Sequence, residues 1–256
     1  MILLGTGTSV GVPALGCRCA VCTGGDPLNR RTRCSAILGL PQGNLLIDTA
    51  PDFHQQMVRE KLGIVHSVLY THEHADHIFG MDDLRLFQFF LGKPVPVFCN
   101  SQVNDTIRRV FDYAFSDKEQ THIGARPAID ITLIDNEPFS VLGNQITPIQ
   151  LGHGPQFDVL GFRIGDIAYC TDCKSIPDES KERLQNLDIL IISALRYDPH
   201  PTHKNIDEAI ETARELGAKR TILTHMSCRI DYQTISKELP PGVEAGYDGM
   251  QFDLRL

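Results

Sequence analysis

The chain has 256 residues, of which 42% are hydrophobic and 22% are charged. This composition supplies both a core and a polar surface, so it excludes a chain that is disordered throughout. The formal net charge of -8 argues against a broad basic surface and therefore against a nucleic-acid polymer as partner. A small anionic substrate held by metal ions remains compatible with this charge.

No stretch reaches the roughly 20 uncharged apolar residues of a membrane helix. Met1 leads directly into Ile2-Leu3-Leu4, without the basic region, long apolar run and cleavage site of a signal peptide. We therefore expect a cytoplasmic protein with no membrane partner. Because layered α/β enzymes of this length fold as one unit, we expect a single domain over residues 1–256.

Apolar segments rich in β-branched residues alternate with segments of helical periodicity. The former predict strands at residues 2–5, 35–40, 44–49, 67–71, 95–98, 131–134, 139–151, 158–164, 167–171, 187–194 and 220–224. The latter predict helices at residues 52–62, 82–91, 102–114, 178–186, 205–216 and 232–239. Asn205 and Glu208 match a capping box at the start of one helix. Residues 116–127 match neither pattern, and we interpret them as either an active-site loop or a contact in a homodimer.

Three histidines and one carboxylate directly follow the predicted strand at residues 67–71. His72, His74, Asp76 and His77 lie within six residues of one another. Imidazole and carboxylate groups bind Zn, Mn or Fe, and positions at the end of a strand can converge on ions. The alternative is a solvated polar turn.

Three further polar residues also follow predicted strands. His153 comes after residues 139–151, Asp172 after 167–171 and His225 after 220–224. Each one alone is a weak signal, because a single polar residue at a strand end is typical of a turn. Together they complete a set of metal ligands.

The segment His72-Glu73-His74-Ala75-Asp76-His77, followed by the three later residues, resembles the metallo-β-lactamase superfamily over nearly the whole chain. The resemblance implies an αβ/βα sandwich of two facing mixed sheets with outer helices. It also implies a partition of the ligands: one metal on His72, His74 and His153, the other on Asp76, His77 and His225, with Asp172 bridging both. We assign Asp76 a catalytic role as well. Two adjacent cations lower the pKa of a shared water, so the expected reaction is hydrolysis.

Cysteines cluster near the start of the chain. Cys17, Cys19 and Cys22 define a predicted zinc-binding loop at residues 17–22, because three thiols this close suit one zinc better than disulfides. Cys228, three residues after His225, is the candidate fourth ligand. The alternative is a set of reduced cysteines in a flexible loop.

This cluster, the opening residues 4–13 and the segment Gly246-Tyr247-Asp248-Gly249-Met250 together resemble PhnP-type cyclic phosphodiesterases. That resemblance implies two active-site ions, Mn2+ or Zn2+, and one structural Zn2+. It also implies a small-molecule phosphodiester substrate, either 5-phosphoribosyl 1,2-cyclic phosphate or a 2',3'-cyclic nucleotide. The zinc site of the family uses three cysteines and a histidine, whereas the matching position here is Cys228.

His203 matches a histidine of the same family that protonates the leaving oxygen or contacts the phosphate, so we assign it a catalytic role. A surface histidine is the alternative, and the nearby His200 makes the match less specific. Arg30, Arg31 and Arg33 could contact phosphate, but solvated charges or pairs with carboxylates are equally compatible.

Hydrolysis of a small cyclic phosphate is the function that these features favour. A tRNase Z-like RNA nuclease would share the metal ligands but needs an RNA-binding insertion. A thioester or lactone hydrolase would use the same metals, and a non-catalytic PqqB-like protein would share the N-terminal cysteines. Cys170 and Cys173, which flank Asp172, leave redox chemistry as a further alternative.

Overall fold

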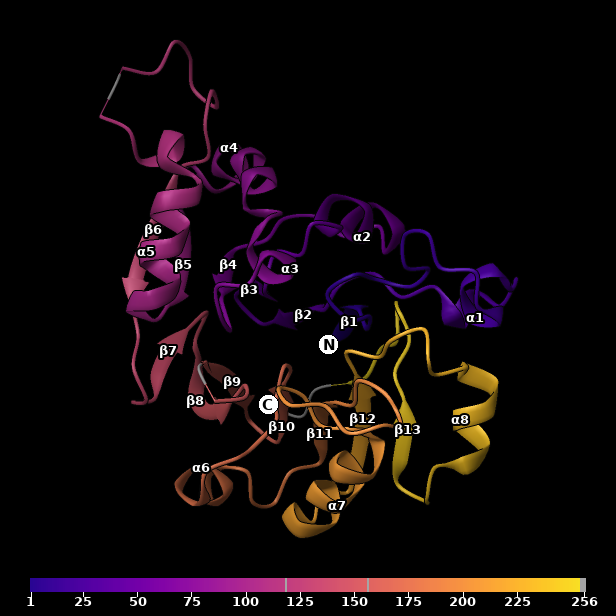
Figure 1. Cartoon of the computed structure of the whole chain (residues 1–256). Helices are drawn as coiled ribbons and strands as arrows, with labels where there is room; N and C mark the ends of the chain where they lie inside the picture. The colour runs from indigo at the N-terminus through magenta and orange to yellow at the C-terminus, as the bar shows by residue number, and fades with distance from the viewer. Residues whose placement is uncertain (118, 156, 254–256) are drawn as a thin grey trace.

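The computed structural model describes residues 1–117, 119–155 and 157–253. Two mixed β-sheets face each other, and helices cover their outer faces (Figure 1). This arrangement confirms the predicted αβ/βα sandwich.

The first sheet has the spatial order β1-β2-β3-β4-β5-β6. Its strands β3 to β6 run parallel to one another, while β2 is antiparallel to β1 and to β3. The bounds are β1 (Ile2–Gly5), β2 (Ser35–Leu40), β3 (Gly43–Ile47), β4 (Ser67–Leu69), β5 (Val95–Cys99) and β6 (Ile129–Leu133).

The second sheet has the order β13-β12-β11-β10-β9-β8-β7, and its strands β10 to β13 are parallel. The bounds are β7 (Phe139–Val141), β8 (Asn144–Gly152), β9 (Asp158–Ile164), β10 (Ile167–Cys170), β11 (Ile189–Ser193), β12 (Arg220–Thr224) and β13 (Val243–Ala245). The backbone N–H of Leu160 in β9 donates to the Thr71 carbonyl, 3.0 Å away, which ties this sheet to the chain after β4.

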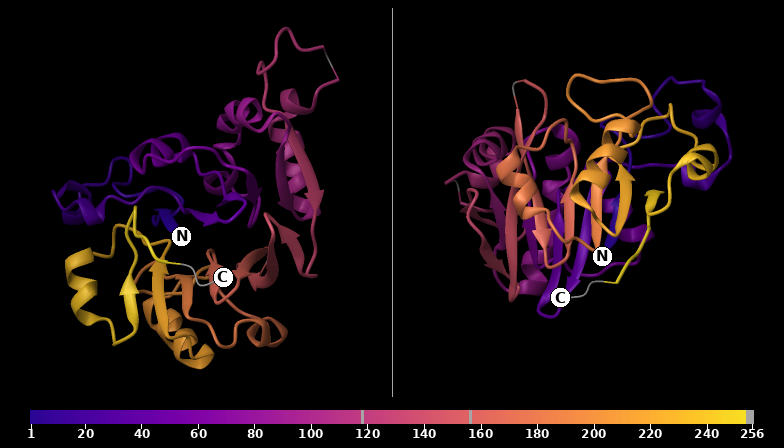
Figure 2. Two further views of the ribbon diagram at one scale, coloured as in Figure 1. Left: turned by 180° about the vertical axis from the view of Figure 1, so that it is seen from behind. Right: turned by 90° about the horizontal axis from the view of Figure 1, so that it is seen from below.

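The helices lie on the two outer faces, as the views from behind and from below also show (Figure 2). The α-helices are α1 (Ala20–Thr23), α2 (Phe53–Arg59), α3 (Ala75–Ile78), α4 (Phe87–Leu91), α5 (Ser101–Val110), α6 (Asp178–Arg183), α7 (Ile206–Leu216) and α8 (Tyr232–Glu238). The 3-10 helices are η1 (Pro27–Asn29), η2 (Met81–Leu86) and η3 (Asp112–Phe115). None of the helices in the described ranges is long and apolar enough to cross a membrane.

Buried side chains divide among three layers, because successive residues of a strand point to opposite faces of its sheet. In β11, Ile189 and Ile191 join the core between the two sheets, whereas Leu190 and Ile192 face α7. On the outer face of the first sheet, Leu46 packs in a cluster with side chains of α2, α3 and α5. The two sheets are therefore apolar on both faces, and polar groups gather where the strands end.

The predicted elements agree with the structure except in a few places. The apolar stretch 139–151 is two strands, β7 and β8, because Leu142 and Gly143 adopt positive φ angles of 50° and 75° in a turn. The helices α1 and α3, the 3-10 helix η1 and the strand β13 lie where no element was predicted. Residues 116–127, apart from residue 118, which lies outside the described residues, form a loop beyond α4 (Figures 1 and 2). Its role as an active-site loop or dimer contact stays a prediction.

Candidate metal centre and thiol cluster

The histidines and aspartates selected from the sequence lie at the carboxyl ends of strands, where loops of both sheets meet. His72 and His74 follow β4, and Asp76 and His77 begin the short helix α3. The second sheet contributes the other residues from the ends of β8, β10 and β12, namely His153, Asp172 and His225. Parallel strands deliver their ends to one edge, so residues far apart in the sequence meet there.

Their side chains form two groups whose ligand atoms lie within 4.8 Å of one another. The first group is His72, His74 and His153. The second group is Asp76, His77, Asp172 and His225. In the first, His72 Nε2 and His74 Nδ1 are 3.0 Å apart. These two groups match the partition that the family resemblance implies.

Asp172 lies between the groups. Its Oδ2 is 3.1 Å from His77 Nε2, and its Oδ1 is 3.3 Å from His225 Nε2. Together with His153 and His203 it also forms a third set of potential ligand atoms within 4.8 Å. Asp172 thus contacts the second group directly and approaches the first group through His153, and its role as a bridging ligand stays a prediction.

The backbone at these strand ends adopts conformations that L-residues rarely populate. Asp172 has φ 51° and His225 has φ 57°, and Asp48, at the end of β3, has φ 61°. Such left-handed residues cost on the order of 1 kcal/mol each, and they persist where the surrounding contacts fix them. All three belong to the site or to the residues that hold it.

Asp48 and Thr71 were not selected from the sequence, yet they orient the ligand side chains. Asp48 Oδ2 lies 2.7 Å from His77 Nδ1, and the Asp48 carboxylate accepts hydrogen bonds from the backbone and hydroxyl of Thr71. The Thr71 hydroxyl is also 3.0 Å from His72 Nδ1. Groups that occupy one nitrogen of an imidazole direct its other nitrogen towards a metal. Asp48 follows the observed strand β3, but the predicted strand at residues 44–49 included it, so the sequence did not mark Asp48 as a residue at a strand end.

Several buried nitrogens at the centre have no hydrogen-bond partner. They are His77 Nε2, His225 Nδ1 and His225 Nε2. An unsatisfied buried polar atom is costly, and metal coordination would satisfy the Nε2 atoms. Three imidazoles in one group and imidazoles with carboxylates in the other are donor sets for divalent ions such as zinc or manganese. The residues therefore fit a pair of metal ions.

Charge at the centre is strongly coupled. Burial alone would lower the pKa of His225, but Asp172 and Cys34 outweigh it and raise that pKa to about 9. Burial would also raise the pKa of Asp172, but His225 and His77 hold it well below its usual range. Without ions the centre thus keeps protonated histidines beside ionised carboxylates. Metal ions must displace these protons in order to bind.

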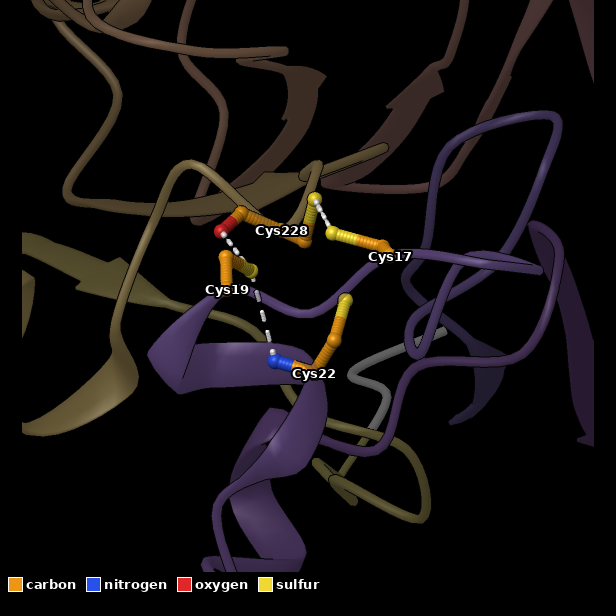
Figure 3. Close-up of side chains that lie close together, drawn as sticks. All are labelled: Cys17, Cys19, Cys22 and Cys228. Atoms are coloured by element: carbon orange, nitrogen blue, oxygen red, sulfur yellow. Dashed lines mark hydrogen bonds between the residues drawn. The ribbon is translucent and has the colours of Figure 1, made fainter.

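The four predicted thiols also come together (Figure 3). The Sγ atoms of Cys17, Cys19, Cys22 and Cys228 lie within 4.8 Å of one another, and those of Cys17 and Cys228 are 3.9 Å apart. All four cysteines are free. Cys19 caps α1 and accepts a long hydrogen bond, 3.5 Å, from the backbone N–H of Cys22. A compact set of four sulfurs without disulfides is the donor set of structural zinc.

A sequence model of the Beta-lactamase superfamily domain matches residues 43–226, which is more than half of the chain. The protein belongs to the metallo-β-lactamase superfamily. It is also similar to the crystal structure of a diphosphatase from the PhnP family, with 37% identity, a TM-score of 0.92 and coverage of 100% of this chain and 97% of that one. The chain is accordingly a PhnP-like member of the superfamily.

Two other superfamily relatives carry different names. An octanoyltransferase of Porphyromonas gingivalis is 37% identical over 254 residues, which cover 98% of this chain but only 50% of that protein. The present chain thus spans half the length of that relative. Zinc-bound PqqB from Methylobacterium extorquens has a TM-score of 0.78 at 21% identity, covers 99% of both chains and shares the fold.

His203 lies beside the metallo-β-lactamase centre, on the loop before α7. Its Nδ1 is 3.6 Å from Asp172 Oδ1 and has no hydrogen-bond partner, and its ring stacks on His225 at 4.7 Å between centroids. Burial and the charge of His225 lower the pKa of His203 to about 3. The imidazole is therefore neutral at neutral pH and can donate one hydrogen bond.

The three arginines considered for phosphate contact bind within the protein. Arg30 donates to the carbonyls of Cys22 and Gly24. Arg31 is buried and donates to backbone carbonyls near Cys228. Arg33 pairs with Asp52, with 3.0 Å between Nε and Oδ2. Their hydrogen bonds therefore stabilise loops.

The cysteines on either side of Asp172 belong to the core. Cys170 and Cys173 are fully buried among apolar side chains of the second sheet. Burial raises the pKa of the Cys173 thiol to about 12, so the thiol stays protonated. Because thiol–disulfide chemistry needs an accessible thiolate, this environment argues against a redox role.

Proposed function

We propose that this metal-dependent hydrolase cleaves small cyclic phosphodiesters, either a 2',3'-cyclic nucleotide or 5-phosphoribosyl 1,2-cyclic phosphate. The observation that carries the proposal is the position of His203, whose free Nδ1 lies 3.6 Å from Asp172 at the edge of the ligand groups. This placement suits a hydrogen-bond donor to a phosphoryl oxygen. The net charge of -8 also favours a small diester over folded RNA.

Two manganese or zinc ions on the two ligand groups, and one zinc on the four thiols, are part of this proposal. When bound, a pair of cations supplies an activated water and neutralises the charge of the phosphate. Manganese suits the substrate's oxygen donors and the carboxylates of Asp76 and Asp172. The zinc would join the loop at residues 17–22 to the loop that follows His225.

The chain's own residues would orient the substrate and stabilise charge. His77 and neighbouring charges hold the pKa of Asp76 well below its usual range, so this carboxylate is ionised at any physiological pH. Asp48 fixes the ring of His77, whose Nε2 points towards Asp76 and Asp172. The neutral imidazole of His203 would then donate a hydrogen bond to the phosphate, and it would have to take up a proton before it could protonate the departing oxygen.

A panel of substrates tests the function. Metal-loaded protein should hydrolyse a 2',3'-cyclic nucleotide with a higher kcat/KM than a glutathione thioester, a lactone or pre-tRNA. Protein stripped with a chelator should be inactive and should recover on addition of manganese. A much higher kcat/KM on the thioester or on pre-tRNA would overturn the cyclic phosphodiester assignment.

Hydrolysis of a diphosphate is a second candidate, because the PhnP-family structure at 37% identity is that of a diphosphatase. Both reactions place a phosphoryl group at the metals, but they differ in the leaving group. A diphosphate releases a phosphate of low pKa, whereas a cyclic diester releases an alkoxide that needs a proton. Direct competition between a dinucleoside diphosphate and a cyclic nucleotide separates the two candidates.

A further inference from the structure

Arg31 is a buried cation that holds the loop carrying Cys228. Its side chain is among the largest that are fully buried, at 1% exposure. Nη1 donates to the carbonyls of Ser227 and Ile230, at 3.2 and 2.9 Å. These two carbonyls stand on either side of Cys228 in the sequence, so the guanidinium fixes the path of the backbone through that residue.

Arg30 holds the other half of the thiol cluster. Its Nη1 donates to the carbonyl of Cys22, at 3.2 Å, and its Nη2 to that of Gly24, at 2.6 Å. The Arg31 backbone also pairs with Val12 in both directions, at 2.8 Å each, just before the loop of Cys17. Two consecutive arginines thus contact the backbone at Cys22 and the backbone on either side of Cys228.

Neither arginine forms an ion pair with a carboxylate within the described part of the chain. Arg31 reaches Asp231 only through Asn29, which accepts from Arg31 Nη2 and donates to Asp231. The carboxylates of Asp248, Asp231 and Asp26 act on the charge of Arg31 from a distance, and so does the sulfur of Cys228. A buried charge without a direct partner is costly, so an anionic group nearby would stabilise it.

We propose that Arg30 and Arg31 are positioning residues for zinc on the four thiols and that Arg31 balances the charge of the loaded site. This inference rests on the proposed zinc site. Four thiolates around Zn2+ carry a net charge of about -2, whereas three thiolates and a neutral histidine carry about -1. The extra thiolate of Cys228 therefore increases the stabilisation that a nearby cation provides.

The first measurement is zinc affinity, by competition with a chromogenic chelator on the full chain. Arg31→Gln should raise the zinc dissociation constant by roughly 10- to 100-fold, as the loss of a group that orients metal ligands does. The matched control is Arg33→Gln, which removes one charge from the same segment but contacts Asp52 instead of the thiol loops. An affinity that is unchanged in Arg31→Gln, or reduced equally in Arg33→Gln, overturns the proposal.

A double-mutant cycle separates charge balance from simple packing. Cys228→His makes the zinc-loaded site less negative by one charge, so it has less need of a nearby cation. The effect of Arg31→Gln on zinc affinity should therefore be several-fold smaller in the Cys228→His background. An equal effect in both backgrounds would show that Arg31 only holds the loop. The Co2+-loaded variants provide a second readout, because thiolate-to-cobalt absorption reports whether all sulfurs still bind.

Arg31→Gln could fail to fold because the side chain is buried. Arg30→Gln then replaces it, since Arg30 is exposed and its loss leaves the core intact. Arg30→Gln should measurably increase the rate of zinc release to a chelator. An unchanged rate would show that Arg30 does not position the zinc ligands. Wild-type protein that holds no zinc on its cysteines would instead overturn the zinc site itself, whereas hydrolase activity is tested separately on the histidine and aspartate ligands.

Discussion

The two ligand clusters of this protein are built in different ways. His72, His77, Asp172 and His225 are buried at strand ends, and hydrogen bonds with Thr71 and Asp48 orient His72 and His77. The thiols lie on two loops and on the short helix α1, and the sulfurs of Cys17 and Cys228 are 3.9 Å apart, close to the spacing of two ligands on one tetrahedral zinc. Side chains at the sheet ends thus orient the histidines, whereas Arg30 and Arg31 hold the backbone that carries Cys22 and Cys228.

The largest expected effect comes from the residue beside the preorganised cluster. His203→Ala should leave the metal content unchanged while kcat falls by roughly 100- to 10,000-fold, which is typical of losing a proton donor. The control is His200→Ala, because this ring lies 5.2 Å from that of His203 and belongs to none of the groups of potential metal ligands found among the described residues. If the loss is the same for a substrate whose leaving group needs no proton, His203 binds phosphate instead of acting as an acid.

The orientation of ligands by Asp48 can be tested next. Asp48→Asn removes the carboxylate charge beside His77 Nδ1, so metal affinity at the sheet edge should fall by roughly 10- to 100-fold. Asp52→Asn is the control, because Asp52 pairs with Arg33 and not with a ligand histidine. Isothermal titration with manganese measures both, and equal affinities would show that the strand ends alone fix His77.

Loss of a thiol from the four-cysteine cluster should lower the melting temperature more than it lowers kcat. Cys228→Ser should lose zinc and unfold at a lower temperature, by about 2–4 °C for each kcal/mol lost in a chain of this size. The metals on the histidines and aspartates should remain, which elemental analysis can check. The control is Ser227→Ala, a neighbouring substitution that leaves all four thiols in place. Unchanged zinc content and unchanged melting would remove Cys228 from the site.

The smallest effect is a pH dependence of stability that chelated protein should show and metal-loaded protein should lack. In chelated protein the raised pKa of His225, about 9 against 6.5 for the free residue, adds stability below pH 6.5. That contribution is lost as pH rises through about 9, so the free energy of unfolding should fall between these values. Metal-loaded protein should show no such fall, because metals displace the protons. Urea denaturation of chelated and metal-loaded protein between pH 6.5 and 9 measures the free energy of unfolding of each. The same pH dependence in the two forms would contradict the raised pKa of His225.

Local patterns in the sequence determined most of the elements and most of the candidate ligands. Alternating apolar residues specified the strands, and Asn205 with Glu208 specified the start of α7 through a capping box that the structure contains. The order His72 to His225 at successive strand ends also indicated the ligand set. These signals are short in range, because periodicity and capping depend on neighbours within a few residues.

Other features depended on contacts between distant segments, so only the tertiary structure could decide them. The strand β13 forms because β12 offers a parallel edge to pair with, and the short helix α3 contains the candidate ligands Asp76 and His77. Asp48 becomes a partner of His77 only when β3 and β4 lie side by side. Arg31 reads in sequence as a surface or phosphate-binding charge, but its partners are carbonyls about two hundred residues away, after β12. Sequence fixes which groups are available, whereas burial and long-range pairing decide which of them meet.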